Sequence, residues 1–136
     1  MAELTRIQIV VALQSCDLFA FCKAEEILRI AGIARERNFP AGRRIYEKSE
    51  PAEVLYAVIH GAVTLDDGRV RRRAGPLAAF GVTELLSGRL RGETATAEDD
   101  TLVLAIEAED FFDLLSNNID IVKALFRHLL RVETES

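Results

Sequence analysis

Short strand-like segments separated by turn residues occupy the chain from about residue 35 to residue 106. The clearest is the apolar run Leu55-Tyr56-Ala57-Val58-Ile59, which continues through Gly61 into Ala62-Val63-Thr64-Leu65. An apolar run of this length predicts a buried strand. Asp67-Gly68, between two such runs, predicts a hairpin with a type I′ turn. Many short strands with turns between them predict an antiparallel β-barrel or jelly roll.

Apolar residues at helical spacing flank this β region on both sides. At the N-terminal side they predict one helix over about 3–14 and another over about 23–33. In the first, Leu4, Ile7, Val10, Val11 and Gln14 fall at helical spacing, and the second has an expected face of Ala24, Ile27, Leu28 and Ala31.

At the C-terminal side, strands near 92–97 and 101–106 precede a short helix at 110–115 and a last helix over about 119–133. Asn118 is a candidate N-cap of that last helix, whose expected apolar stripe is Val122, Leu125, Phe126, Leu129 and Val132. At 136 residues, the chain is the size of one domain. We expect a single α+β, mainly β domain over 1–136: helices over about 3–33, a β-barrel over about 35–106, and C-terminal helices over about 108–133.

Charge, hydropathy and residue spacing exclude several classes of function. The net charge of −5 disfavours non-specific nucleic acid binding. No apolar run can span a bilayer and no secretory signal is visible, so a cytoplasmic location is expected. Cys16 and Cys22 are expected to be reduced core thiols. His60 and His128 lie far apart without partners at metal-ligand spacing, and no nucleophile has a general base beside it, so neither a metal site nor an enzyme is expected.

The run Arg69-Val70-Arg71-Arg72-Arg73 is the one basic segment. Contact with a phosphate backbone is one interpretation of it, but no aromatic residues are interleaved. An exposed edge strand that is protected by charge is the better one.

The stretch from Phe80 to Ala97 predicts an anion-binding turn. It consists of a tight Gly turn, one turn of helix, a Ser-Gly break and an Arg-led strand. Free backbone N–H groups at a helix start, with a guanidinium close by, hold a phosphate. Arg91 would supply two parallel charge-assisted bonds, Gly92 close approach of the backbone, and Thr94 a hydroxyl.

From about Leu13 to Leu130 the chain carries several motifs in one order. Leu18-Phe19 follows the first helix, and Phe39-Pro40-Ala41-Gly42 precedes Ile45. Next come Leu55-Tyr56-Ala57-Val58-Ile59-His60-Gly61-Ala62-Val63, then Phe80-Gly81, Arg91, Ala97, and Leu102 to Ile106. This order resembles the cyclic nucleotide-binding domain family.

The resemblance implies a jelly-roll β-barrel (a double-stranded β-helix) flanked by helices, used as a regulatory module that controls an effector. It implies cyclic AMP or cyclic GMP as ligand and no other cofactor. In the family, a Glu after Phe-Gly binds the ribose 2′-hydroxyl, an Arg pairs with the cyclic phosphate, and the C-terminal helix closes over the base or mediates dimerisation. The ligand-binding residues expected here are Phe80, Gly81, Val82, Thr83, Glu84, Arg91, Gly92 and Thr94.

The sequence departs from the family at two positions. Val82 stands where the ribose-binding Glu is expected, and the lost charge-assisted bond costs about 1.5–3 kcal/mol, roughly ten- to a hundredfold in affinity. Glu84 points about 200° away from Val82 on a helical turn, so it is not expected to replace that Glu. Glu93 either lies beside Arg91 and neutralises it, or turns to solvent at a bulge. Arg89 is expected to be a solvated loop arginine.

Two hypotheses follow. The first is a non-catalytic sensor of the cyclic nucleotide-binding type with weakened or altered binding. The alternative is a degenerate barrel that binds no nucleotide and serves as a protein-interaction or structural module. No helix-turn-helix follows the last helix, so direct DNA binding is not expected. The sequence does not identify the effector, and a homodimer through the C-terminal helix is a further expectation.

Overall fold

The computed structural model describes the backbone of residues 3–135 and the side chains of residues 3–131. Three helical segments open the chain: α1 (Arg6–Ser15), the 3₁₀ turn η1 (Asp17–Phe19) and α2 (Ala24–Ala31). Six strands follow: β1 (Ala34–Phe39), β2 (Arg44–Tyr46), β3 (Val54–His60), β4 (Val63–Asp66), β5 (Arg71–Ala74) and β6 (Ala79–Phe80). The remaining elements are α3 (Val82–Ser87), β7 (Thr94–Ala97), β8 (Thr101–Glu107), α4 (Ala108–Ser116) and α5 (Ile119–Glu135).

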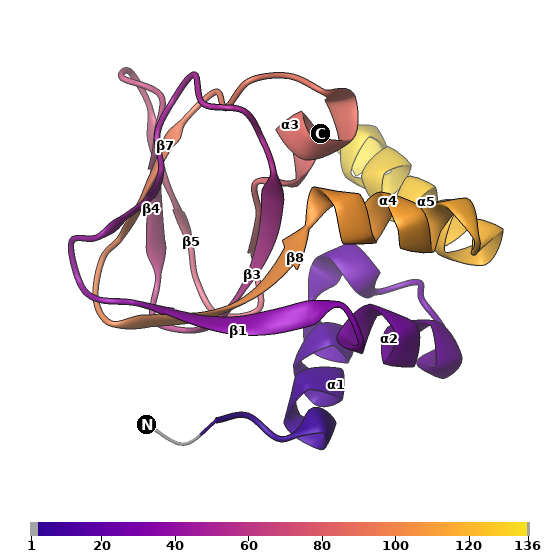
Figure 1. Ribbon diagram of the computed structural model, residues 1–136. Coiled ribbons are helices and arrows are strands. Elements are labelled where there is room, and N and C mark those ends of the chain that lie inside the picture. The colour runs from indigo at the N-terminus through magenta and orange to yellow at the C-terminus, as the bar shows by residue number, and fades with distance from the viewer. Residues whose placement is uncertain (1–2, 136) are drawn as a thin grey trace.

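The strands form two antiparallel four-stranded sheets, ordered β1-β8-β3-β6 and β2-β7-β4-β5. The helices lie on one side of the first sheet, and the second sheet lies on its other side (Figure 1). The expected jelly roll flanked by helices is confirmed. The expected closure into a barrel is wrong, because the two sheets remain separate layers.

The middle position of the first sheet explains the apolar run of β3. Its side chains alternate between two cores, with Leu55 and Ala57 facing the helices and Tyr56 and Val58 facing the second sheet. The neighbouring β8 is buried on both faces from Thr101 to Ile106. A strand between two layers has no solvent-facing side, so its sequence does not alternate between apolar and polar residues.

The β region differs from the expectation in two places. β1 lies where no strand was predicted, and pairs along its length with β8, from Ala34 opposite Ile106 to Phe39 opposite Thr101. The turn after β4 is not type I′, because Asp67 is not among the non-glycine residues with positive φ. Its carboxylate instead accepts the N–H groups of Arg69 and Val70 at 2.8 and 2.7 Å, which shapes a longer loop.

The buried faces of the two N-terminal helices match the expectation only in part. On α1, Ile7 is 76% exposed and Val11 is also exposed, whereas Leu13 is fully buried. On α2, Ile27 and Ala31 are buried as expected, Ile30 is also buried, and Leu28 is exposed. The apolar residues of α1 are spread around the helix rather than gathered on one side, so its period alone does not select the face that packs.

Other expectations concern single residues. The cysteines Cys16 and Cys22 are free thiols, as expected, and burial raises the pKa of Cys22 to about 11. Asn118 directly precedes α5, and its backbone carbonyl accepts the N–H groups of Ile121 and Val122 at 3.0 and 3.4 Å. Its side chain is used elsewhere: Oδ1 accepts a hydrogen bond from Arg29 and the amide donates to the Leu114 carbonyl. On α5, Leu125 is buried but Phe126 is 60% exposed, so the expected stripe is wrong there. The side chain of Val132 lies outside the described residues.

Candidate functional site

The part of the anion-binding stretch from Phe80 to Gly92, called the cassette below, begins where β6 ends and α3 starts. Gly81 caps α3 with a left-handed φ of 76°, and no side chain caps the helix there. A Cβ on Gly81 would lie 2.8 Å from Nη1 of Arg91, a separation that real side chains do not tolerate. Glycine is needed at this turn for both reasons: the backbone conformation and the close approach of the guanidinium.

Arg91 is fixed in the site by its backbone. Its N–H donates to the Glu50 carbonyl at 2.8 Å, and its own carbonyl accepts from the Ser49 N–H at 2.8 Å. These two bonds hold the residue against the loop before β3. The side chain then points inward and is only 2% exposed, which contrasts with an ordinary solvent-exposed strand arginine.

The guanidinium of Arg91 has several partners inside the protein. Nη1 donates to the Gly81 carbonyl at 2.8 Å, and Nη2 donates to the Val54 carbonyl. The ring of Tyr46 lies beneath it, with 4.0 Å from the guanidinium carbon to the ring centroid. Nε is buried and has no hydrogen-bond partner within the described part of the chain. A buried charged donor without an acceptor is unfavourable. The Nε–H of Arg91 is therefore the hydrogen-bond donor of the site that a ligand could use.

The carboxylate beside Arg91 comes from α3. Glu84 Oε1 lies 3.5 Å from Nη1 of Arg91. Glu93, for which pairing with Arg91 was one expectation, is bound instead to Arg72 through two bonds of 2.8 and 2.9 Å. The alternation argument fails because β7 begins only at Thr94, and residues 92 and 93 lie in a bend before it.

The other expected ligand residues do not converge on the guanidinium. Phe80 is buried between the sheets, stacked 5.0 Å from the ring of Tyr56. Val82 packs in the helix-side core and lines a crevice of about 260 Å³ between η1, β6 and α5. Thr83 and Gly92 are exposed.

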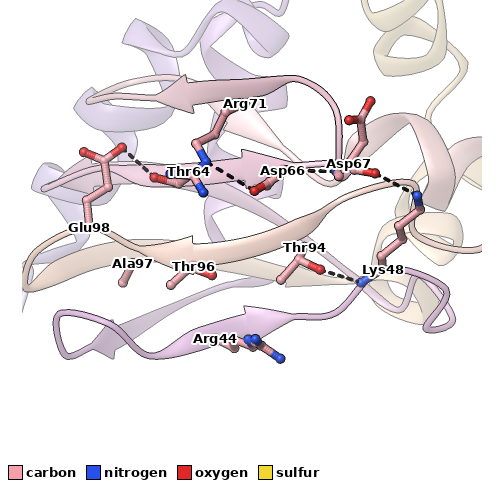
Figure 2. A pocket seen from close by; sticks show the side chains of 11 residues that line it. Arg44, Lys48, Thr64, Asp66, Asp67, Arg71, Thr94, Thr96, Ala97 and Glu98 are labelled. Carbon is pink, nitrogen blue, oxygen red and sulfur yellow. Dashed lines mark hydrogen bonds and ion pairs between the residues drawn. The ribbon is translucent and has the colours of Figure 1, made fainter.

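Thr94 lies on the outer face of the second sheet, apart from the cassette. Its hydroxyl accepts the Lys48 N–H at 3.1 Å (Figure 2). The next residue, Ala95, is fully buried between the sheets. Strand alternation therefore directs the Thr94 side chain outward. The Thr94 hydroxyl, which was expected to contact the phosphate, does not lie beside Arg91.

Two ion pairs and one phenol define the electrostatics of the site. Burial chiefly raises the pKa of Tyr46 to about 12; Arg91 and Arg72 oppose this rise, and the charges of Glu84 and Glu93 contribute to it. All four charges therefore act on one ring. Two guanidinium groups and two carboxylates leave the cluster without excess charge.

A polar hollow of about 620 Å³ lies on the outer face of the second sheet, away from the cassette (Figure 2). Its side chains are largely bound to one another. Asp66 pairs with Arg71 at 3.2 Å, and the Thr64 hydroxyl donates to Glu98 at 2.8 Å. The hollow is therefore explained by contacts across neighbouring strands.

The basic run forms β5 at the edge of the second sheet, which confirms the edge-strand interpretation. Three of its arginines pair with carboxylates: Arg71 with Asp66, Arg72 with Glu93 and Arg73 with Glu98. Arg89, after α3, is exposed and its Nε donates to the Ser87 hydroxyl. Within the described residues, no helix is both long and apolar enough to cross a membrane.

Comparison with known proteins identifies this arrangement. A family model, the cyclic nucleotide-binding domain, matches residues 36–118, which is more than half of the chain and includes Gly81, Glu84 and Arg91. This chain belongs to the cyclic nucleotide-binding domain family. The match extends from β1 to the start of α5, and it includes both sheets and the whole cassette.

Three relatives illustrate the range of proteins that contain this domain. A cyclic nucleotide-gated potassium channel of Mesorhizobium japonicum is 31% identical over 74% of this chain and 28% of its own length. A cGMP-dependent 3′,5′-cGMP phosphodiesterase A of Dictyostelium discoideum is 24% identical over 89% of this chain, but over only 14% of its own length. The crystal structure of Thermus thermophilus catabolite activator protein has a TM-score of 0.74 and 29% identity, over 88% of this chain and 59% of that one.

Proposed function

We propose that this chain is a non-catalytic regulatory domain that binds cyclic AMP or cyclic GMP with weakened affinity. The observation that supports it is the buried guanidinium of Arg91, whose Nε lacks an acceptor among the described residues. A phosphate oxygen would supply both the missing acceptor and a negative charge. Cyclic nucleotides also appear in the names of two relatives, a gated channel and a phosphodiesterase. Arg91, Gly81 and the first turn of α3 would hold the phosphate.

Two residues support weakened binding. Val82 has no acceptor for a ribose hydroxyl, and its side chain packs in the helix-side core instead. Glu84 already stands 3.5 Å from the guanidinium. The free thiols Cys16 and Cys22 fit a reducing compartment, and a cytoplasmic location is part of this proposal.

A second candidate is the degenerate module that binds no nucleotide. It is favoured by the number of internal partners of Arg91, because the carbonyls of Gly81 and Val54 already accept from both terminal nitrogens. In this case the guanidinium would be a structural tie between β3 and the cassette turn.

Calorimetric titration with cyclic AMP and cyclic GMP distinguishes the two candidates. For the sensor, we expect measurable heat with the wild type and at least a tenfold weaker Kd for Arg91→Ala, because a charge-assisted contact is removed. Arg89→Ala is the matched control, since the side chain of this exposed arginine donates to the Ser87 hydroxyl and its removal should leave the Kd unchanged. No heat with either ligand at millimolar concentration would contradict the sensor and leave the structural module.

Dimerisation through α5 is a further part of this proposal. Phe126, 60% exposed, is the apolar side chain on which a second copy would pack. We expect wild-type protein at about 100 µM to sediment as a dimer and Phe126→Ser to sediment as a monomer. A wild-type protein that is monomeric at every concentration would contradict this expectation.

A further inference from the structure

Glu84 occupies the approach to the buried guanidinium of Arg91. Its Oε1 lies 3.5 Å from Nη1, and its side chain is 21% exposed. Its other oxygen, Oε2, would lie 3.8 Å from a Cβ built on Gly92, so the carboxylate extends from α3 across to the Arg91-Gly92 backbone. An anion entering from solvent toward Arg91 therefore meets a carboxylate first.

The surrounding charges leave no excess attraction for an incoming anion. Arg72, the second guanidinium near Tyr46, is held by both oxygens of Glu93 at 2.8 and 2.9 Å. Its pKa is raised chiefly by that hydrogen bond, and the charge of Glu84 also contributes. A phosphate added to this neutral group of four would bring a third negative charge against two positive ones.

We propose that Glu84 is a built-in competitor of the ligand phosphate, and that its carboxylate must leave Arg91 before a cyclic nucleotide can bind. This inference rests on the proposed function. Glu84, on α3, would then weaken ligand binding. The family's Glu at the position of Val82 has the opposite effect, because it binds the ribose. Glu84 sets the affinity of the site through competition for one guanidinium.

Calorimetry of Glu84→Gln tests the inference. Glutamine keeps the shape of the side chain and removes its charge, so we expect the Kd for cyclic AMP or cyclic GMP to fall at least tenfold below that of the wild type. Glu93→Gln is the matched control, because it removes a neighbouring carboxylate that binds Arg72 rather than Arg91. We expect its Kd to fall by less than that of Glu84→Gln, since freeing Arg72 adds attraction for an anion without removing a carboxylate from Arg91.

Three results of this titration would overturn the inference. A weaker Kd for Glu84→Gln would mean that Glu84 contacts the ligand, and an unchanged Kd would mean that it does not compete. An equal gain for Glu93→Gln would mean that only net charge matters. If Glu84→Gln fails to fold, Glu84→Asp retracts the carboxylate by one methylene and should give a smaller gain in the same direction.

A second measurement separates this inference from the proposed function. If no variant binds a cyclic nucleotide, inorganic phosphate is titrated while the Nε–H signal of Arg91 is followed by NMR; its loss in Arg91→Lys assigns the signal. We expect phosphate to shift it in Glu84→Gln at concentrations at least tenfold lower than in the wild type. Equal responses, or none in either protein, would overturn the competition by Glu84 itself.

Discussion

Gly61→Ala is expected to lower the free energy of unfolding by about 2–5 kcal/mol. Gly61 joins β3 to β4 with a φ of 86°, and a left-handed conformation costs a residue with a Cβ roughly 1–2 kcal/mol. A Cβ there would also lie 2.7 Å from each of three oxygens, the Asp100 carbonyl, Asp99 Oδ1 and Thr101 Oγ1. Relieving that overlap adds roughly 1–3 kcal/mol. Urea unfolding monitored by circular dichroism measures the change.

The oxygens around Gly61 cannot move freely. The Thr101 hydroxyl is buried and donates to the Ala62 carbonyl at 3.1 Å, while Asp99 Oδ1 accepts the Ala62 N–H at 3.2 Å. Displacing them breaks the contact between the β3–β4 turn and the β7–β8 turn. This is why the overlap is expected to be costly.

Gly68→Ala is the matched control for Gly61→Ala. Gly68 has a φ of 99°, and a Cβ there would meet nothing within 4 Å. It therefore shares the backbone strain without the overlap, and we expect a loss of roughly 1–2 kcal/mol. Equal losses for the two substitutions would show that the packing around Gly61 relaxes without cost.

Gly61 also illustrates which parts of the fold could be predicted from the sequence. The apolar run that starts at Leu55 predicted a buried strand, and β3 is present. The expectation continued the run through Gly61, whereas β3 ends at His60 and β4 starts at Val63. These signals are local: a doubly covered strand is apolar throughout, and a left-handed turn selects glycine. The strand β1 lacks such a signal because its charged residues Arg35, Glu36 and Arg37 do not alternate with apolar ones.

The candidate site was less predictable because its geometry depends on which direction the cassette faces. The estimate that Glu84 points about 200° from Val82 agrees with their separate surroundings. Val82 packs toward the helices, and Glu84 is the residue on the side of Arg91. Sequence spacing gives the angle between two side chains, but the guanidinium is placed by the bonds of Arg91 to Ser49 and Glu50, which are distant in the chain. The burial of the Arg91 guanidinium also depends on these distant contacts, so the local sequence could not predict it.

Phe111→Ala is expected to lower the free energy of unfolding by about 3–5 kcal/mol, because it leaves a cavity in a core that cannot fully collapse. Phe111, on α4, is fully buried and belongs to the helix-side cluster that includes Val82 and Leu85 of α3. Its loss should therefore loosen the support of the cassette as well as the helices. Thermal unfolding should show a Tm lower by on the order of 10 °C.

The neighbouring residue provides the control. Phe112 has the same side chain on the same helix but is 44% exposed, so Phe112→Ala should cost less than about 1 kcal/mol. If both substitutions lowered the Tm equally, the stability of α4 would come from its own helical propensity rather than from packing against the first sheet. If only Phe111→Ala lowered it, the stability of the helix-side cluster, which includes Val82 and Leu85 of α3, would depend on the buried packing of α4.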